Sequence, residues 1–162
     1  MLSLRTHLRV FFRSLFIQAG FSPQALQSLG VLYAIDPALK VLYPNDGDRQ
    51  TAIRRHLTPF NTHPYVATGM IGGILFYESR IARGEASTES VTRFKETLMG
   101  PLAVLGDGFF WLSLRPAISA LSCALVPLIG LWSMAAFLIA YNVIHLSARF
   151  WLYWVGIAQG DQ

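Results

Sequence analysis

The chain has 162 residues, of which 53% are hydrophobic and 14% are charged, and its net charge is +4 at pH 7. A soluble domain usually carries about 25% charged residues, so this composition excludes an ordinary water-soluble domain and indicates a membrane protein. The basic residues are spread among apolar segments rather than gathered in a patch, which argues against nucleic acid as a partner.

The first predicted helix covers residues 4–17 and is amphipathic. Arg5, Arg9 and Arg13 recur every four residues along one face, while leucine and phenylalanine side chains cover another. Such a helix suits the headgroup region of a membrane, where arginine favours anionic lipid. The alternative is a helix packed on a protein core with its basic face in water.

Three shorter helices are predicted next, each opened by a capping or proline signal. Ser22-Pro23 opens a helix over residues 24–33, Asp36-Pro37 opens one over 38–43, and Asp48 caps one that ends at Leu57. A helix that crosses a bilayer needs about 20 apolar residues. These helices are therefore expected beside the membrane rather than across it.

The apolar part of the chain begins with two interrupted stretches. Residues 65–77 are hydrophobic and rich in glycine but too short to cross a bilayer, so we expect a re-entrant segment or a buried helix. A polar stretch over 83–95 follows, with Ser87 as a helix cap. Residues 98–114 are again apolar, and Gly100-Pro101 predicts a break in them.

The strongest apolar segment covers residues 117–144 and carries no charge. At about 1.5 Å per residue, one straight helix of this length exceeds a hydrocarbon core of about 30 Å. The segment must tilt, kink at Pro127, or fold as a hairpin near residues 127–130, and a kink and a hairpin place the following residues on opposite sides. An aromatic cluster at 150–154 is typical of an interface anchor.

These elements define the predicted architecture. The fold class is all-α: an integral membrane protein with N-terminal amphipathic and cytoplasmic helices, re-entrant or Gly/Pro-broken membrane helices, and at least one spanning helix. We predict a helical collar over residues 1–60, a membrane-embedded region over 61–158 and a tail over 159–162. Eleven of the thirteen Lys and Arg residues precede Gly100, and this asymmetry predicts a cytoplasmic N-terminus.

The sequence offers little for catalysis. It contains no P-loop, no dinucleotide-binding glycine pattern, no HExxH pair and no nucleophile elbow, and its four histidines are separate in sequence. Cys123 is its one cysteine, which leaves no cysteine-based metal cluster. We expect no catalytic residue, no cofactor and no metal site.

Polar side chains that stand in or beside the apolar segments are the candidate site. An acid inside an apolar segment costs about 2.5–3.5 kcal/mol unless it faces a cavity or a partner. Carboxylates, amides and aromatic rings are also the groups that hold a sugar. The candidate residues in or beside these segments are Asn61, His63, Glu78, Asp107, Trp111 and Arg115. The alternative is structural: an Asp107–Arg115 pair, with Glu78 paired to Arg80 or a helix end.

Several stretches together resemble a known family. In order and spacing they are similar to the IID subunit of the mannose/fructose/sorbose family of the bacterial phosphotransferase system. The stretches are AIRRHL at 52–57, FNTHPY at 60–65, LMGPLA at 98–103, GD at 106–107, FW at 110–111 and RP at 115–116. The resemblance extends from Phe11 to the end of the chain.

The resemblance implies a role in transport. A IID subunit pairs with a IIC subunit in the bacterial cytoplasmic membrane, in a homo-oligomer of IIC–IID pairs, and is not itself phosphorylated. IIA and IIB relay a phosphoryl group from phosphoenolpyruvate, through HPr, to a mannose-type hexose. The six candidate residues would line the sugar path, with Arg115 orienting the others. A non-transporting scaffold or regulator that binds a IIC-like partner is the alternative, and a stand-alone membrane enzyme is a third.

The chain also departs from the family pattern. Where the family usually has a pair of acids, only Glu78 remains, and Leu112 replaces the usual glycine after the FW pair. Typical members continue beyond the position of Gln162 with further apolar segments. A minimal natural form, a degenerate paralogue and a fragment are all compatible with this pattern.

Overall fold

The computed structural model describes residues 2–158 and contains helices without a strand among them. The helical elements, in chain order, are α1 (Leu4–Ser14), α2 (Ser28–Leu42), α3 (Asp46–His56), α4 (Ala67–Ala82), α5 (Thr88–Gly106), the π-helix η1 (Asp107–Leu114), α6 (Arg115–Ile129) and α7 (Trp132–Ala158). The predicted all-α fold is confirmed. The predicted tail at 159–162 lies outside the described residues.

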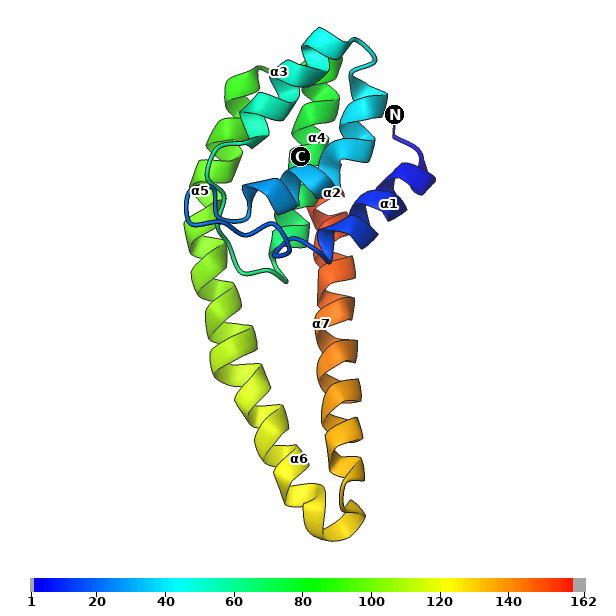
Figure 1. Ribbon diagram of the computed structural model, residues 1–162, viewed down its shortest axis with the longest axis vertical. Helices are drawn as coiled ribbons and strands as arrows, with labels where there is room; N and C mark the ends of the chain where they lie inside the picture. The colour runs from blue at the N-terminus through cyan, green and yellow to red at the C-terminus, as the bar shows by residue number, and fades with distance from the viewer. Residues whose placement is uncertain (1, 159–162) are drawn as a thin grey trace.

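Two long arms extend from a compact helical end (Figure 1). One arm is a continuous helix of 42 residues from Thr88 to Ile129, about 63 Å long, and the other is α7, whose 27 residues span about 40 Å. Both are long and apolar enough to cross a bilayer. They meet at Gly130, whose φ of +56° favours glycine. The apolar segment therefore folds as a hairpin rather than a kinked span.

Pro37 does not end a helix, contrary to the prediction of two separate helices over 24–33 and 38–43. The single helix α2 begins only at Ser28, after Leu26 adopts a φ of +55°, and it passes through Pro37. A proline inside a helix leaves the carbonyl four residues earlier without its N–H partner. Here Arg13 Nη1 donates to that carbonyl of Tyr33 at 3.2 Å, which offsets the missing bond.

The predicted break in residues 98–114 is also wrong. The helix continues past Pro101 and then widens into η1, where the Arg115 N–H reaches back five residues to the carbonyl of Phe110. A π-helix accommodates extra residues without interrupting the helix, and such segments are frequent at functional sites. A smaller correction concerns α3, which is capped by Asn45 rather than Asp48, because Asn45 Oδ1 accepts from the Gly47 N–H at 2.8 Å.

The core lies at the compact end, where α4 is buried between its neighbours. Met70, Ile71 and Ile74 of α4 are buried, so the buried-helix alternative describes this segment. Facing glycines allow α4 to approach α7 closely. A Cβ atom on Gly156 would lie 2.0 Å from the carbonyl oxygen of Gly69. Small residues permit such close approach of membrane helices.

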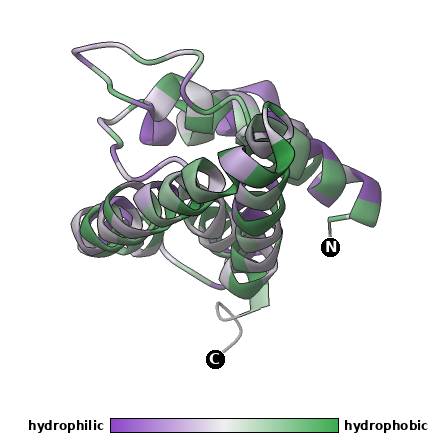
Figure 2. Ribbon diagram, turned by 90° about the horizontal axis from the view of Figure 1, so that it is seen from below, coloured by the Kyte–Doolittle hydropathy of each residue, from purple (hydrophilic) through white to green (hydrophobic). Residues whose placement is uncertain are grey.

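The arms contrast with this core. Only 6% of the apolar window in each arm is buried, and their exposed side chains include Leu112, Leu128 and Trp132. Seen along the arms, mostly hydrophobic and neutral residues follow the long helices, and hydrophilic residues gather in the peripheral helices (Figure 2). Apolar surface of this extent requires lipid or a membrane partner.

Candidate functional site

Glu78 is the centre of a buried polar cluster at the compact end. Its Oε1 accepts from Arg55 Nε at 2.9 Å and lies 3.0 Å from His56 Nε2. Its Oε2 accepts from Arg55 Nη2 at 3.1 Å and from the Tyr43 hydroxyl at 2.7 Å. Lys95 closes the cluster by donating to the Arg55 carbonyl at 2.9 Å. The cluster joins α2, α3, α4 and α5, and it favours the structural reading of Glu78, although with Arg55 rather than Arg80.

Burial and pairing act in opposite directions on the acid. Burial raises the pKa of the Glu78 carboxyl, but its contacts with His56, Tyr43 and Arg55 outweigh that effect and hold the pKa below its usual value. Burial lowers the pKa of His56, although its contact with Glu78 opposes the shift. The native cluster therefore contains a charged carboxylate and a neutral imidazole.

Acidification is expected to destabilise this cluster. The pKa of His56 is below 6.5 in the folded chain, so protons bind the unfolded form first and stability falls as the pH drops below about 6.5. The lowered pKa of Glu78 adds a further loss below about 4.5. The thermal midpoint in detergent, measured from pH 8 to 4, should fall less steeply between 6.5 and 5 for His56→Gln than for the unchanged chain. Equal slopes would exclude His56 as a contributor.

A second cluster lies where the loop before α4 meets η1. His63 is buried and stacks on Phe110 with ring centroids 5.2 Å apart and planes at 10°. Trp111 contacts His63 edge-on at 5.7 Å, and Asp107 is near enough to act electrostatically on the imidazole. Gly106 makes this approach possible, because a Cβ atom there would lie 2.3 Å from the Cβ of His63.

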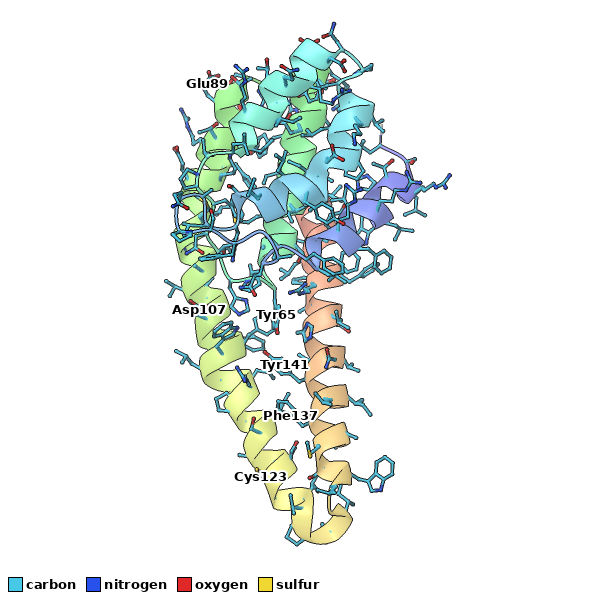
Figure 3. The ribbon with its side chains drawn as sticks, in the orientation of Figure 1. Tyr65, Glu89, Asp107, Cys123, Phe137 and Tyr141 are labelled. Carbon is cyan, nitrogen blue, oxygen red and sulfur yellow. The ribbon has the colours of Figure 1, made fainter. Side chains whose placement is uncertain are left out.

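Helix α7 provides the other side of this cluster. Tyr65 stacks on His145 with centroids 4.4 Å apart and planes at 13°, and the Arg149 guanidinium lies 4.6 Å from the centre of the Tyr65 ring. The ring centroids of Tyr141 and Tyr65 are 6.2 Å apart. Figure 3 shows Tyr65 and Tyr141 in the region between the two arms. The rings of Tyr65, Tyr141 and His145 and the guanidinium of Arg149 thus form one cluster in the region between the two arms.

Several polar atoms of this cluster are buried without a hydrogen-bond partner among residues 2–158. They are His63 Nε2, His145 Nδ1, Arg149 Nε and the neighbouring Thr62 Oγ1. Leaving such an atom unpaired costs about 1–3 kcal/mol, and buried polar atoms normally find a partner. Aromatic faces beside free donors and acceptors are suited to a polar solute with an apolar face, as a sugar has.

The structure brings together only part of the predicted site. His63, Asp107 and Trp111 gather at η1, whereas Glu78 lies in the other cluster and Asn61 is an exposed loop residue. Arg115 is exposed at the start of α6 and acts electrostatically on Tyr141. Residues four and eight apart would share one face of an α-helix, but Asp107 and Trp111 belong to the π-helix η1. No ion pair joins Asp107 to Arg115 in the part of the chain that the structure describes.

Sequence reasoning missed the contributions of α7 and of Tyr65. Tyr141, His145 and Arg149 follow one another at intervals of four residues within an apolar helix, and side chains four apart share a helix face. The isolated positive charge of Arg149 could have identified this face, because a charge in such a segment requires a partner.

An exposed apolar hairpin joined to a compact helical end is the architecture of a helical membrane protein. The sequence model of the family described as "PTS system mannose/fructose/sorbose family IID component" matches residues 1–162. The chain belongs to this family, and the resemblance is confirmed.

Relatives and a solved structure agree with this assignment. The mannose-specific EIID component of Escherichia coli K12 is 37% identical over 153 residues, which cover 93% of this chain and 53% of the relative. The fructose permease IID component of Bacillus subtilis is 32% identical, with 93% and 55% covered. A cryo-EM structure of the mannose transporter ManYZ with microcin E492 matches with a TM-score of 0.94 and 34% identity, covering 99% of this chain and 59% of that one. The chain spans about half the length of the curated relatives it matches.

Proposed function

We propose that the chain is the IID subunit of a phosphoenolpyruvate-dependent sugar phosphotransferase permease in the bacterial cytoplasmic membrane. With a IIC subunit it forms the path for a mannose-type hexose, which IIB phosphorylates with a phosphoryl group supplied through HPr and IIA. The family match over residues 1–162 carries this proposal. The exposed apolar arms support it, because they leave a large surface for a membrane partner.

The proposed arrangement in the membrane follows the charge distribution. The collar of residues 1–60 and the N-terminus face the cytoplasm, and residues 61–158 are embedded, with IIC–IID pairs assembled into a homo-oligomer. The arms supply the membrane crossing in this arrangement, since they are the two helices long enough for it among the described residues. The subunit has no catalytic residue of its own and acts only within the complex.

The proposed sugar path follows the cluster at η1. His63, Asp107 and Trp111 contact the sugar, and Arg115, eight residues after Asp107, is the cation that orients the set. Asn61 stays in the proposed set as an exposed residue at the entrance. Glu78 also stays a predicted contact, although its contacts with Arg55, His56 and Tyr43 favour a structural role.

The unpaired buried atoms add residues to the proposed path. Tyr65 and His145 present stacked rings there, and Arg149 presents a guanidinium nitrogen that lacks a partner in residues 2–158. A sugar hydroxyl, or a water that bridges to it, would satisfy these atoms.

Uptake measurements test the proposal. Cells that lack their own IID subunit but produce HPr, IIA, IIB and IIC are given this chain, and phosphoenolpyruvate-dependent uptake of labelled mannose, fructose and sorbose is measured. We expect uptake of at least one sugar. Asp107→Asn should lower this uptake tenfold or more at unchanged membrane levels, because the exposed acid of η1 that binds the sugar hydroxyls loses its charge. Glu96→Gln removes an exposed acid of the same arm away from the cluster and should leave uptake unchanged.

The result also separates the proposal from its alternative. Co-purification with IIC without uptake of any sugar would favour a non-transporting scaffold. Uptake that is equally high for Asp107→Asn and the unchanged chain would remove Asp107 from the sugar path.

A further inference from the structure

A groove between α1 and α2 combines exposed arginines with exposed apolar side chains. Its volume is about 930 Å³. Arg5, Arg9 and Arg13 of α1 line it together with Leu4 and Phe12 of the same helix. This surface is separate from both clusters described above, and neither the sugar path nor the core makes use of it.

The charges in the groove leave two cations without a partner. Its one carboxylate, Asp36, is already paired with Arg13 at 3.3 Å and with Lys40 at 2.9 Å. Arg5 and Arg9 are exposed and form no ion pair or hydrogen bond through their side chains with other residues between positions 2 and 158. They lie one helical turn apart on the same face. Two adjacent guanidinium groups with no acid to share are suited to a phosphate.

The apolar side chains of the groove favour an amphiphile over a free anion. Leu4 is 63% exposed and Phe12 is 60% exposed. Helix α1 therefore has apolar side chains on two sides. Val10 and Phe11 are buried in the protein, while other apolar side chains face outward. The helix beside the N-terminus in Figure 2 contains both hydrophobic and hydrophilic residues along its length. A dissolved phosphate ion has no apolar part to contact these exposed apolar side chains, whereas the acyl chain of a lipid would contact them.

The position of α1 matches the level of lipid headgroups. Phe11 packs edge-on against Phe150 of α7 at 5.4 Å, and His7 Nδ1 lies 3.1 Å from the Tyr153 hydroxyl. Beside them Trp151 is 65% exposed. Tyrosine and tryptophan concentrate at the boundary between hydrocarbon and water, so the aromatic end of α7 marks that boundary and α1 lies against it.

We propose that this groove binds the headgroup of an anionic phospholipid, with Arg5 and Arg9 on the phosphate and Leu4, Leu8 and Phe12 beside the acyl chains. The lipid thereby holds α1 at the membrane surface and stabilises the contact of α1 with α7. This site is independent of the proposed transport function.

A lipid titration of the purified full chain in uncharged detergent tests the proposal. The thermal midpoint is measured against added phosphatidylglycerol, phosphatidylcholine and inorganic phosphate. We expect a saturable rise with phosphatidylglycerol alone. A basic residue near an anionic surface contributes about fivefold in affinity, so Arg5→Gln/Arg9→Gln should need roughly 25-fold more phosphatidylglycerol for half of the effect.

Two matched variants complete the test. Arg54→Gln/Arg93→Gln removes two exposed cations outside the groove and should keep the unchanged response. Arg5→Lys/Arg9→Lys keeps both charges and should retain most of the rise with phosphatidylglycerol. This variant tests the proposal even if the glutamine variant folds poorly. The proposal is overturned if phosphatidylcholine or inorganic phosphate reproduces the rise, or if the glutamine pair in the groove responds like the pair outside it.

Discussion

Replacement of Gly156 by alanine is expected to separate α7 from α4 and to lower the stability of the folded chain by about 3 kcal/mol, at the upper end of typical overpacking costs. The new Cβ would lie 2.0 Å from the Gly69 carbonyl oxygen and 2.9 Å from the Gly73 amide nitrogen. Both are backbone atoms of α4, so no flexible side chain can move aside. The measurement is the thermal midpoint in detergent together with the amount of chain recovered from membranes.

Gly108→Ala is the matched control for this prediction. A Cβ atom on Gly108 meets nothing within 4 Å, and the residue is likewise inside a helical arm. Alanine has the higher helix propensity, so this variant should be at least as stable as the unchanged chain. Equal stability of Gly156→Ala and Gly108→Ala would show that α4 and α7 do not cross at the glycines.

Replacement of Glu78 by alanine is expected to have the second large effect. It would leave Arg55 and His56 buried without their acceptor, and the loss of one partner from a buried ion pair costs about 3–5 kcal/mol. Glu78 is fully buried and the Arg55 side chain is 11% exposed, so water cannot replace the carboxylate easily. We expect a loss of folded protein, and therefore of uptake, seen as aggregation in size-exclusion chromatography in detergent.

Glu85→Gln provides the comparison for Glu78. Glu85 forms an exposed ion pair with Arg83 at 2.7 Å, and exposed pairs contribute little, so folding and uptake should be unchanged. Normal assembly of Glu78→Ala with abolished uptake would contradict the structural role and restore the sugar contact that the sequence predicts.

Local signals predicted most of the helices but not their continuity. The amphipathic first helix follows from periodicity. The length of the apolar segment limited it to a tilted, kinked or hairpin form, and only the structure shows the hairpin. The break expected at Pro37 fails because Arg13, distant in sequence, donates to the carbonyl of Tyr33. The break expected near Pro101 is absent, because α5 contains the proline and continues into the π-helix η1. Tertiary hydrogen bonds and a change of helix type are not visible in local propensity.

The site was predictable to a similar extent. Polar and aromatic residues beside Pro64 and in the second apolar stretch led to His63 and Trp111, which are in contact. The search for acids also led to Glu78, whose partners come from α2 and α3 and could not be paired with it by spacing alone. The contribution of α7 depends on the hairpin, because only the return of the chain at Gly130 brings His145 beside Tyr65.

The turn at Gly130 also determines which ends of the two arms lie on the same side of a membrane. It sends the chain back along the first arm, so the segment before Thr88 and the last turn of α7 at Ala158 lie at the same end of the pair of arms (Figure 1). If both arms cross the bilayer, protease sites inserted at these two positions are cut from one compartment, and a site inserted at the turn is cut from the other. An inversion of the arms would exchange all three together, so the orientation of the arms is a single choice rather than two.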